Sequence, residues 1–175
     1  LLPEHKFIKG QPDTGAELAD DLELITNKFE GEIAACIIEP IAGSTGILVP
    51  PEGYLDRLRK ICDKHGILLI FDEVITGWGR TGSPFAAQEF NVTPDIMTLA
   101  KATTNGVVPM GVVAVRDGIY EAVMDSAPEG AIELFHGYTY SGIPSAVAAA
   151  LAVQDILEKE NIFNRVKEIS PYFQE

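Results

Sequence analysis

The sequence predicts an α/β fold, a mostly parallel sheet with helices on both faces. A continuous apolar run (33–39), an amphipathic segment (51–65) and a second apolar run (67–72) follow one another, which is the order of a βαβ unit. Two shorter apolar segments, 95–100 and 110–115, are compatible with further strands of the same sheet. Nothing in the sequence indicates a domain boundary.

The first elements follow from periodicity. The segment 14–29 is predicted to be a helix because its apolar residues recur every three to four positions, and Thr14 and Glu17 have the spacing of a capping box. The run 33–39 is apolar throughout before its final glutamate and includes β-branched residues, so we expect a strand buried on both faces. Pro40 ends it.

The later elements are bounded by proline and glycine. Pro51 is placed to open the next helix and Gly66 to stop it. Further helices are predicted at 117–124, at 143–160 and from Asn161 until Pro171. The segment 127–142 reads as a loop.

Composition excludes some partners. The net charge of −13 argues against nucleic acid and against an anionic membrane surface, because both need a basic face. Cys36 and Cys62 each lie in an apolar run, which favours core filling over a disulfide or a metal site. This pattern fits a reducing cytoplasm, and we expect no bound metal.

Polar residues follow the predicted strands where ligands bind in parallel sheets, at the carboxyl ends. Glu39 ends the first strand, Asp72 and Glu73 end the second, and Lys101 follows the third. For any one residue the ordinary interpretation is favoured: a strand terminus for Glu39, a loop or helix cap for Asp72, a solvated lysine for Lys101. Their convergence at one sheet edge is the stronger signal.

The surrounding strings add a resemblance. They are I-I-E-P-I-A-G-S-T-G, V-P-P-E-G-Y-L, F-D-E-V-I-T-G-W-G-R-T-G, P-D-I-M-T-L-A-K-A-T-T-N-G and F-H-G-Y-T-Y-S-G-I-P. In this order and at these intervals the chain resembles the class III aminotransferases, fold-type I enzymes that depend on pyridoxal 5′-phosphate. The resemblance runs nearly end to end, and it implies that residues 1–175 are part of the cofactor-binding large domain.

The resemblance assigns roles that chemistry explains. Lys101 matches the lysine that holds the cofactor as a Schiff base, which a substrate amine can displace. Asp72 matches the aspartate that keeps the pyridine nitrogen protonated, so that the ring accepts electrons. Val74 matches the branched residue packed on one face of the ring, where ordinary strand-edge packing would look the same.

Two further matches concern the edge of the site. Thr139 matches a threonine that hydrogen-bonds the cofactor phosphate of the neighbouring subunit, which implies a homodimer; without its context it would be an ordinary loop threonine. Glu39 matches a glutamate with a supporting place near the cofactor. Arg80 matches an arginine for which an ion pair within the fold is as good an interpretation as any function.

Three positions depart from the residues usual in the family, and two of them indicate a branch within it. Ile75 stands where many members have a glutamine that touches the cofactor, and Ser44 stands where the ornithine and 4-aminobutyrate enzymes have a glutamate. Both changes resemble the ω-amino acid:pyruvate branch. Trp78 stands where phenylalanine is usual. The expected reaction is transfer of an amino group from an amine or ω-amino acid to a keto acid, with pyruvate expected as acceptor.

Other readings stay open. The family's glycine- and serine-rich phosphate loop, the aromatic residue on the second ring face and the C-terminal small domain have no match, so these 175 residues are expected to be inactive alone. A related decarboxylase or aminomutase would keep the cofactor and break another bond. A non-catalytic fragment would bind no cofactor. The hypothesis of a nucleotide-binding α/β protein has little support, because no glycine-rich fingerprint follows a strand.

Overall fold

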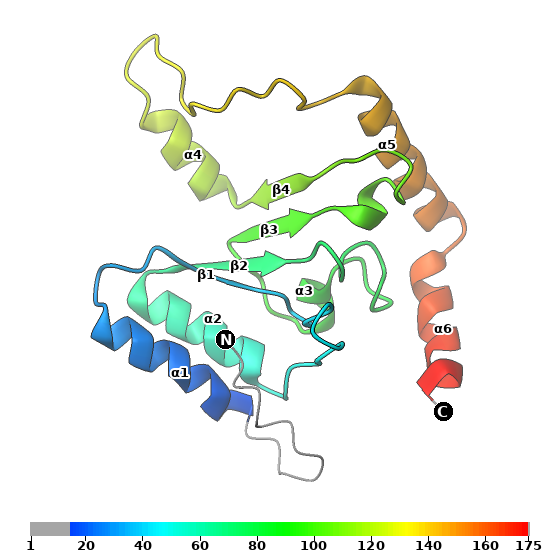
Figure 1. Cartoon of the computed structure of the whole chain (residues 1–175), viewed down its shortest axis with the longest axis horizontal. Helices are drawn as coiled ribbons and strands as arrows, with labels where there is room; N and C mark the ends of the chain where they lie inside the picture. The colour runs from blue at the N-terminus through cyan, green and yellow to red at the C-terminus, as the bar shows by residue number, and fades with distance from the viewer. Residues whose placement is uncertain (1–14, 175) are drawn as a thin grey trace.

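The computed structural model describes residues 15–174 and contains one four-stranded sheet (Figure 1). Its strands, in spatial order, are β1 (Ala35–Ile38), β2 (Leu68–Asp72), β3 (Ile96–Leu99) and β4 (Val112–Val115). β1, β2 and β3 are parallel, and β4 is antiparallel to β3. The α/β class with a mostly parallel sheet is therefore confirmed, as are all four predicted strands within two residues at each end.

The helices fall into two groups. α1 (Gly15–Lys28) and α2 (Tyr54–His65) pack on each other beside β1 and β2, and α5 (Pro144–Lys159) and α6 (Ile162–Gln174) form the opposite side of the molecule (Figure 1). Three shorter helices complete the fold: α3 (Ala86–Glu89), the 3₁₀ helix η1 (Lys101–Thr103) and α4 (Asp117–Asp125). Residues 127–142 form the predicted loop.

Helix boundaries differ from expectation at two prolines. α2 begins at Tyr54 rather than at Pro51, because Gly53 has a φ of 79° and the helix starts only after this left-handed residue. α6 continues through Pro171 to Gln174; at this place the proline removes only one hydrogen bond of the last turn. Gly66, with a φ of 65°, ends α2 as predicted. Thr14, the predicted cap of the first helix, lies outside the described residues.

The core lies between α2 and one face of the sheet. Leu69 and Phe71 of β2 are fully buried against the apolar stripe of α2, which consists of Tyr54, Leu55, Leu58, Ile61 and Cys62. Cys62 is fully buried and Cys36 packs against this cluster, and both are free thiols. Core filling is thus confirmed for both cysteines.

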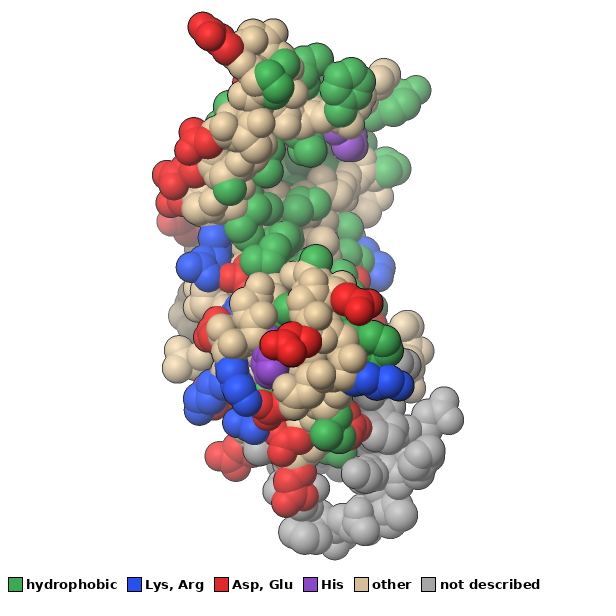
Figure 2. Space-filling model, turned by 90° about the vertical axis from the view of Figure 1, so that its left-hand side faces the viewer, with side chains coloured by type: hydrophobic (Ala, Val, Ile, Leu, Met, Phe, Trp, Pro, Cys, Tyr) green, Lys and Arg blue, Asp and Glu red, His purple; other side chains and the backbone are tan. Residues whose placement is uncertain are grey.

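The other face of the sheet is more open. Ile37 of β1 is 62% exposed and Val113 of β4 is 66% exposed. The expectation that the first strand is buried on both faces is therefore wrong for the described part of the chain. The reason is that side chains alternate along a strand, and α2 covers only the side that carries Cys36 and Leu69. Figure 2 shows hydrophobic side chains across the middle of the molecule's left-hand side.

A buried carboxylate holds the beginning of β3. Asp95 is 5% exposed; its Oδ2 accepts from Leu69 N and Arg59 Nη1, each at 2.7 Å, and its Oδ1 accepts from Arg116 Nη1 at 2.5 Å. Burial by itself raises the pKa of Asp95, but the backbone donor and the two guanidinium groups outweigh it, so that the pKa lies below its usual value. Asp95 therefore connects β2, α2 and the residue that follows β4 through hydrogen bonds.

No helix in the described range 15–174 is long and apolar enough to cross a membrane.

Candidate active site

Asp72 and Lys101 lie at the same edge of the sheet. β2 and β3 are neighbours and parallel, and Asp72 is in register with Thr98. Lys101 follows Thr98 by three residues, which span at most about 10 Å, and neighbouring strands are about 4.8 Å apart. The backbone positions of Asp72 and Lys101 therefore lie near each other, at the carboxyl ends of two neighbouring strands. Figure 1 shows the ends of β2 and β3 side by side.

The carboxylate of Asp72 is held through one oxygen. Oδ1 accepts from Thr98 Oγ1 at 3.2 Å and from the backbone N–H of Val74 at 3.1 Å. No residue between 15 and 174 donates to Oδ2 at hydrogen-bond distance. The side chain is therefore oriented by the protein while one oxygen remains for a cationic group of a ligand.

Lys101 carries an amine that has no partner among residues 15–174. Its side chain is exposed, and it forms neither an ion pair nor a side-chain hydrogen bond with the described residues. Its backbone has a φ of 44°, a left-handed conformation that is unfavourable for a residue with a Cβ atom. Strained residues of this kind cluster at functional sites.

Glu73 has a structural role that distinguishes it from its neighbour Asp72. Its side chain is fully buried, and it accepts hydrogen bonds from Thr76 Oγ1, Ala86 N and Ala87 N at 3.1, 2.6 and 2.8 Å. The two adjacent carboxylates point to opposite sides of the strand. Glu73 fixes the loop after β2 to the start of α3, and so holds the segment that carries Val74.

Glu39 holds the loop after β1. Its Oε2 accepts from Gly43 N at 3.0 Å. A Cβ atom on Gly43 would lie 2.7 Å from Ile75 Cδ1, so the loops after β1 and β2 are in close contact. Glu39 is thus placed beside the segment that follows Asp72, as a loop-holding residue.

Neither Thr139 nor Arg80 makes a hydrogen bond or an ion pair with Asp72 or Lys101 within the described residues. Thr139 is exposed in the loop 127–142 and has no hydrogen bond to Asp72, Val74 or Lys101 within the described residues. The Arg80 side chain is exposed and forms no ion pair with any residue of the described range. Within one chain, the structure brings together Asp72, Val74 and Lys101 at neighbouring strand ends but does not add Thr139.

The backbone conformation and the close packing against α6 explain why glycines lie on both sides of Arg80. Gly79 and Gly82 have φ values of 93° and 87°, and Cβ atoms there would lie 2.8 Å from Phe163 and 2.6 Å from Lys167 of α6. The G-R-T-G string therefore lets the loop after β2 pack directly against α6.

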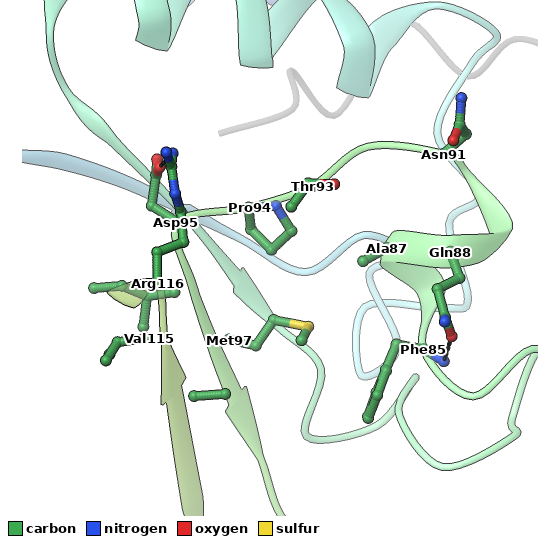
Figure 3. A pocket seen from close by; sticks show the side chains of 12 residues that line it. Phe85, Ala87, Gln88, Asn91, Thr93, Pro94, Asp95, Met97, Val115 and Arg116 are labelled. Carbon is green, nitrogen blue, oxygen red and sulfur yellow. Dashed lines mark hydrogen bonds and ion pairs between the residues drawn. The ribbon is translucent and has the colours of Figure 1, made fainter. Parts of the chain in front are cut away.

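Neither of two pockets in the described part of the chain is lined by Asp72, Val74 or Lys101. A pocket of about 510 Å³ lies between the loop at 77–80, η1 and the helices α5 and α6, and Ala102, the neighbour of Lys101, is among its lining residues. A second, of about 380 Å³, lies at the other end of β3, between the sheet and α3 (Figure 3). There both oxygens of Asp95 are occupied, and Arg116 lies beside it (Figure 3). No group of three potential metal ligands occurs in the described part of the chain.

Sequence reasoning missed two residues that shape the site. Thr98 orients Asp72, and its signal was present: it is the one polar residue in the apolar strand I-M-T-L. Glu73 was seen only as a polar strand end. Its burial follows from strand alternation, since Phe71 two residues earlier faces the core.

A mostly parallel sheet with a carboxylate and a lysine at neighbouring strand ends is the arrangement that the sequence motifs predict, and comparison with known proteins identifies the family. The family model of the class-III aminotransferases matches residues 2–175, and the chain belongs to that family. Enzymes of this family use pyridoxal 5′-phosphate.

Individual relatives are similar along nearly the whole chain. An omega-aminotransferase of Caulobacter vibrioides is 56% identical over 99% of this chain and 40% of its own length. An omega-amino acid–pyruvate aminotransferase of Pseudomonas putida is 52% identical over 99% of this chain and 39% of its own length. The chain thus spans about two fifths of these relatives.

A solved structure gives the same fold. The PLP-bound amine transaminase of an uncultivated Pseudomonas species superposes with a TM-score of 0.84 and 41% identity, over 90% of this chain and 36% of that one. The described residues fit the cofactor at two of its groups: the amine of Lys101 suits its aldehyde, and the open oxygen of Asp72 suits its protonated ring nitrogen.

Proposed function

We propose that the whole enzyme containing this chain is a transaminase that moves an amino group from an amine or ω-amino acid to pyruvate, with pyridoxal 5′-phosphate held by Lys101. The observation that supports the proposal is that Asp72, which Thr98 orients, and Lys101, whose side chain has no partner among residues 15–174, lie at the ends of neighbouring parallel strands. The chain would form part of the cofactor-binding large domain. When bound, the cofactor supplies an electron sink for the substrate carbon.

Each residue at this edge has a chemical task. Lys101 would hold the cofactor through its amine and, as a free amine, would serve as the base that takes the proton from the substrate carbon. Asp72 keeps a positive charge on the ring nitrogen, because its carboxylate is fixed by Thr98 and is not neutralised by any described cation. Val74 packs on one face of the ring. Glu39 supports this loop from β1 through its bond to Gly43.

The acceptor is inferred from the relatives and from two side chains. The Pseudomonas putida relative is named for pyruvate. Ser44 is a small, exposed residue in the loop that Glu39 holds, and the branched Ile75 packs against Gly43 of the same loop. Neither carries a charge that would select a second carboxylate at this position. Pyruvate, with a single carboxylate and a small methyl group, fits this chemistry.

We expect the whole enzyme to form alanine from pyruvate when β-alanine or another primary ω-amine is the donor. The measurement is alanine formation by chromatography, with parallel detection of carbon dioxide. Turnover that needs no keto acid, or that releases carbon dioxide in proportion to donor consumed, would replace transamination by isomerisation or decarboxylation.

The exposed loop 127–142 supports a second proposal, that the enzyme is a homodimer in which Thr139 binds the cofactor phosphate of the partner subunit. In this loop Phe135 is 96% exposed and Tyr140 is 83% exposed, which is unusual for large aromatic side chains in a soluble protein. A second copy of this chain would cover them.

The free thiols and the acidic composition also fit a cytoplasmic location.

Hybrid dimers test this arrangement. We expect Thr139→Val to weaken cofactor binding by about 10- to 100-fold, the usual effect of losing a hydrogen bond to a charged group. Co-expressed with Lys101→Ala subunits, it should regain close to half of the wild-type activity per dimer, because one site then has both an intact lysine and an intact threonine. If Thr139 served its own subunit, the hybrids would keep the weakened cofactor binding of Thr139→Val.

A further inference from the structure

The turn that carries Lys101 is held by a network of its own. Thr104 N and Gly106 N both donate to Lys101 O, at 3.4 and 3.2 Å, and Thr104 Oγ1 donates to Val108 O at 2.5 Å. Thr103 and Thr104 are each 2% exposed. These contacts are needed, because the left-handed backbone of Lys101 is unfavourable and persists only where its surroundings impose it.

One contact reaches this turn from a distant segment. Trp78 Nε1 donates to Thr103 Oγ1 at 2.9 Å, and Thr103 Oγ1 donates onward to Ala100 O at 3.0 Å. Ala100 and Thr103 lie on either side of the lysine and its neighbour Ala102. The indole therefore holds the turn at both ends of the segment that contains Lys101.

Trp78 is itself fixed in place. Its backbone N–H donates to Pro84 O at 2.7 Å, and its ring meets Phe85 edge to face at 5.3 Å between centroids. The preceding Gly77 allows the loop to approach the end of β3, since a Cβ atom there would lie 3.0 Å from Leu99 Cδ2. The indole N–H is thus presented to Thr103 by a loop that starts at Asp72.

The chemistry of the ring distinguishes tryptophan from phenylalanine here. Indole has one N–H donor, and a phenyl ring has none. Trp78 departs from the phenylalanine usual in the family. The structure shows a consequence of this change, because the indole N–H donates to the Thr103 hydroxyl and a phenyl ring would leave that oxygen without this donor.

We infer that Trp78 is a positioning residue for Lys101, which acts through the hydrogen bond from its indole to Thr103. This inference rests on the proposed function for its effect on catalysis. The loop after β2 thereby connects Asp72 with Lys101. It follows Asp72 directly, and its Trp78 holds the backbone turn that carries Lys101.

The test uses Trp78→Phe and Thr103→Val in the whole enzyme, with Thr103→Ser as the conservative variant that keeps the hydroxyl. Phe85→Leu is the matched control for lost aromatic packing, because Trp78 then keeps both its indole N–H and the backbone bond to Pro84 O that fixes its loop. The first readout is amide hydrogen exchange of residues 101–106 in the cofactor-free protein. The second is the rate at which added pyridoxal phosphate becomes attached, and the third is kcat and KM for the amine.

We expect Trp78→Phe and Thr103→Val each to speed exchange in this segment, to slow cofactor attachment, and to lower kcat by about fivefold with KM within twofold of wild type. Thr103→Ser should behave like wild type. The double variant Trp78→Phe/Thr103→Val should lose no more kcat than Thr103→Val alone. Unchanged exchange in Trp78→Phe would overturn the inference, as would equal effects in Phe85→Leu. Changed exchange and attachment in an enzyme without amine-to-pyruvate transfer would leave the inference standing and remove the proposed function.

Discussion

Lys101→Ala is expected to abolish covalent cofactor attachment and to reduce transaminase activity by at least about 10⁴-fold, because one amine serves both as the attachment point and as the proton-transfer base. The fold should be unaffected. The side chain is exposed and holds no described residue, so its loss leaves no buried group unpaired.

The measurement is absorbance of the bound cofactor, followed by borohydride reduction and peptide mass mapping. In the wild-type enzyme the reduced cofactor should map to the peptide that contains Lys101. Lys60→Ala is the matched control, since Lys60 is an exposed lysine of α2 whose one ion pair within residues 15–174 is with Asp56. Reduced cofactor on any other lysine would exclude Lys101 from this role.

Asp72→Asn is expected to lower kcat by about 10³-fold, or about 4 kcal/mol of transition-state stabilisation. Asparagine keeps an oxygen for Thr98 Oγ1 and Val74 N, so the end of β2 should keep its structure. What it loses is the negative charge that keeps the ring nitrogen protonated. The effect is therefore expected in kcat and in the cofactor's spectrum, with little change in thermal stability.

Asp56→Asn serves as the control, because it neutralises an exposed aspartate of α2 that pairs with Lys60. A second variant, Thr98→Val, tests the orientation of the carboxylate and should give a smaller loss in the same direction. Activity of Asp72→Asn within threefold of wild type would contradict the assigned charge interaction.

The sequence by itself determined the order and type of the major elements. Apolar runs and helical periodicity located β1, α2 and β2, and Gly66 marked the end of α2, because these signals are local. The positions of Asp72 and Lys101 at neighbouring strand ends also followed, since parallel strands connected by a helix place their carboxyl ends at one edge. The motifs then identified the family.

The tertiary structure alone decided contacts between residues far apart along the chain. Thr98 bonds Asp72 across 26 residues and Trp78 bonds Thr103 across 25, and both bonds depend on the register between segments. The open side of β1 was likewise undetermined, because an apolar strand has the same sequence whether one face or both are covered. Local patterns specify which element forms, whereas the partner of each side chain is set by how the elements pack.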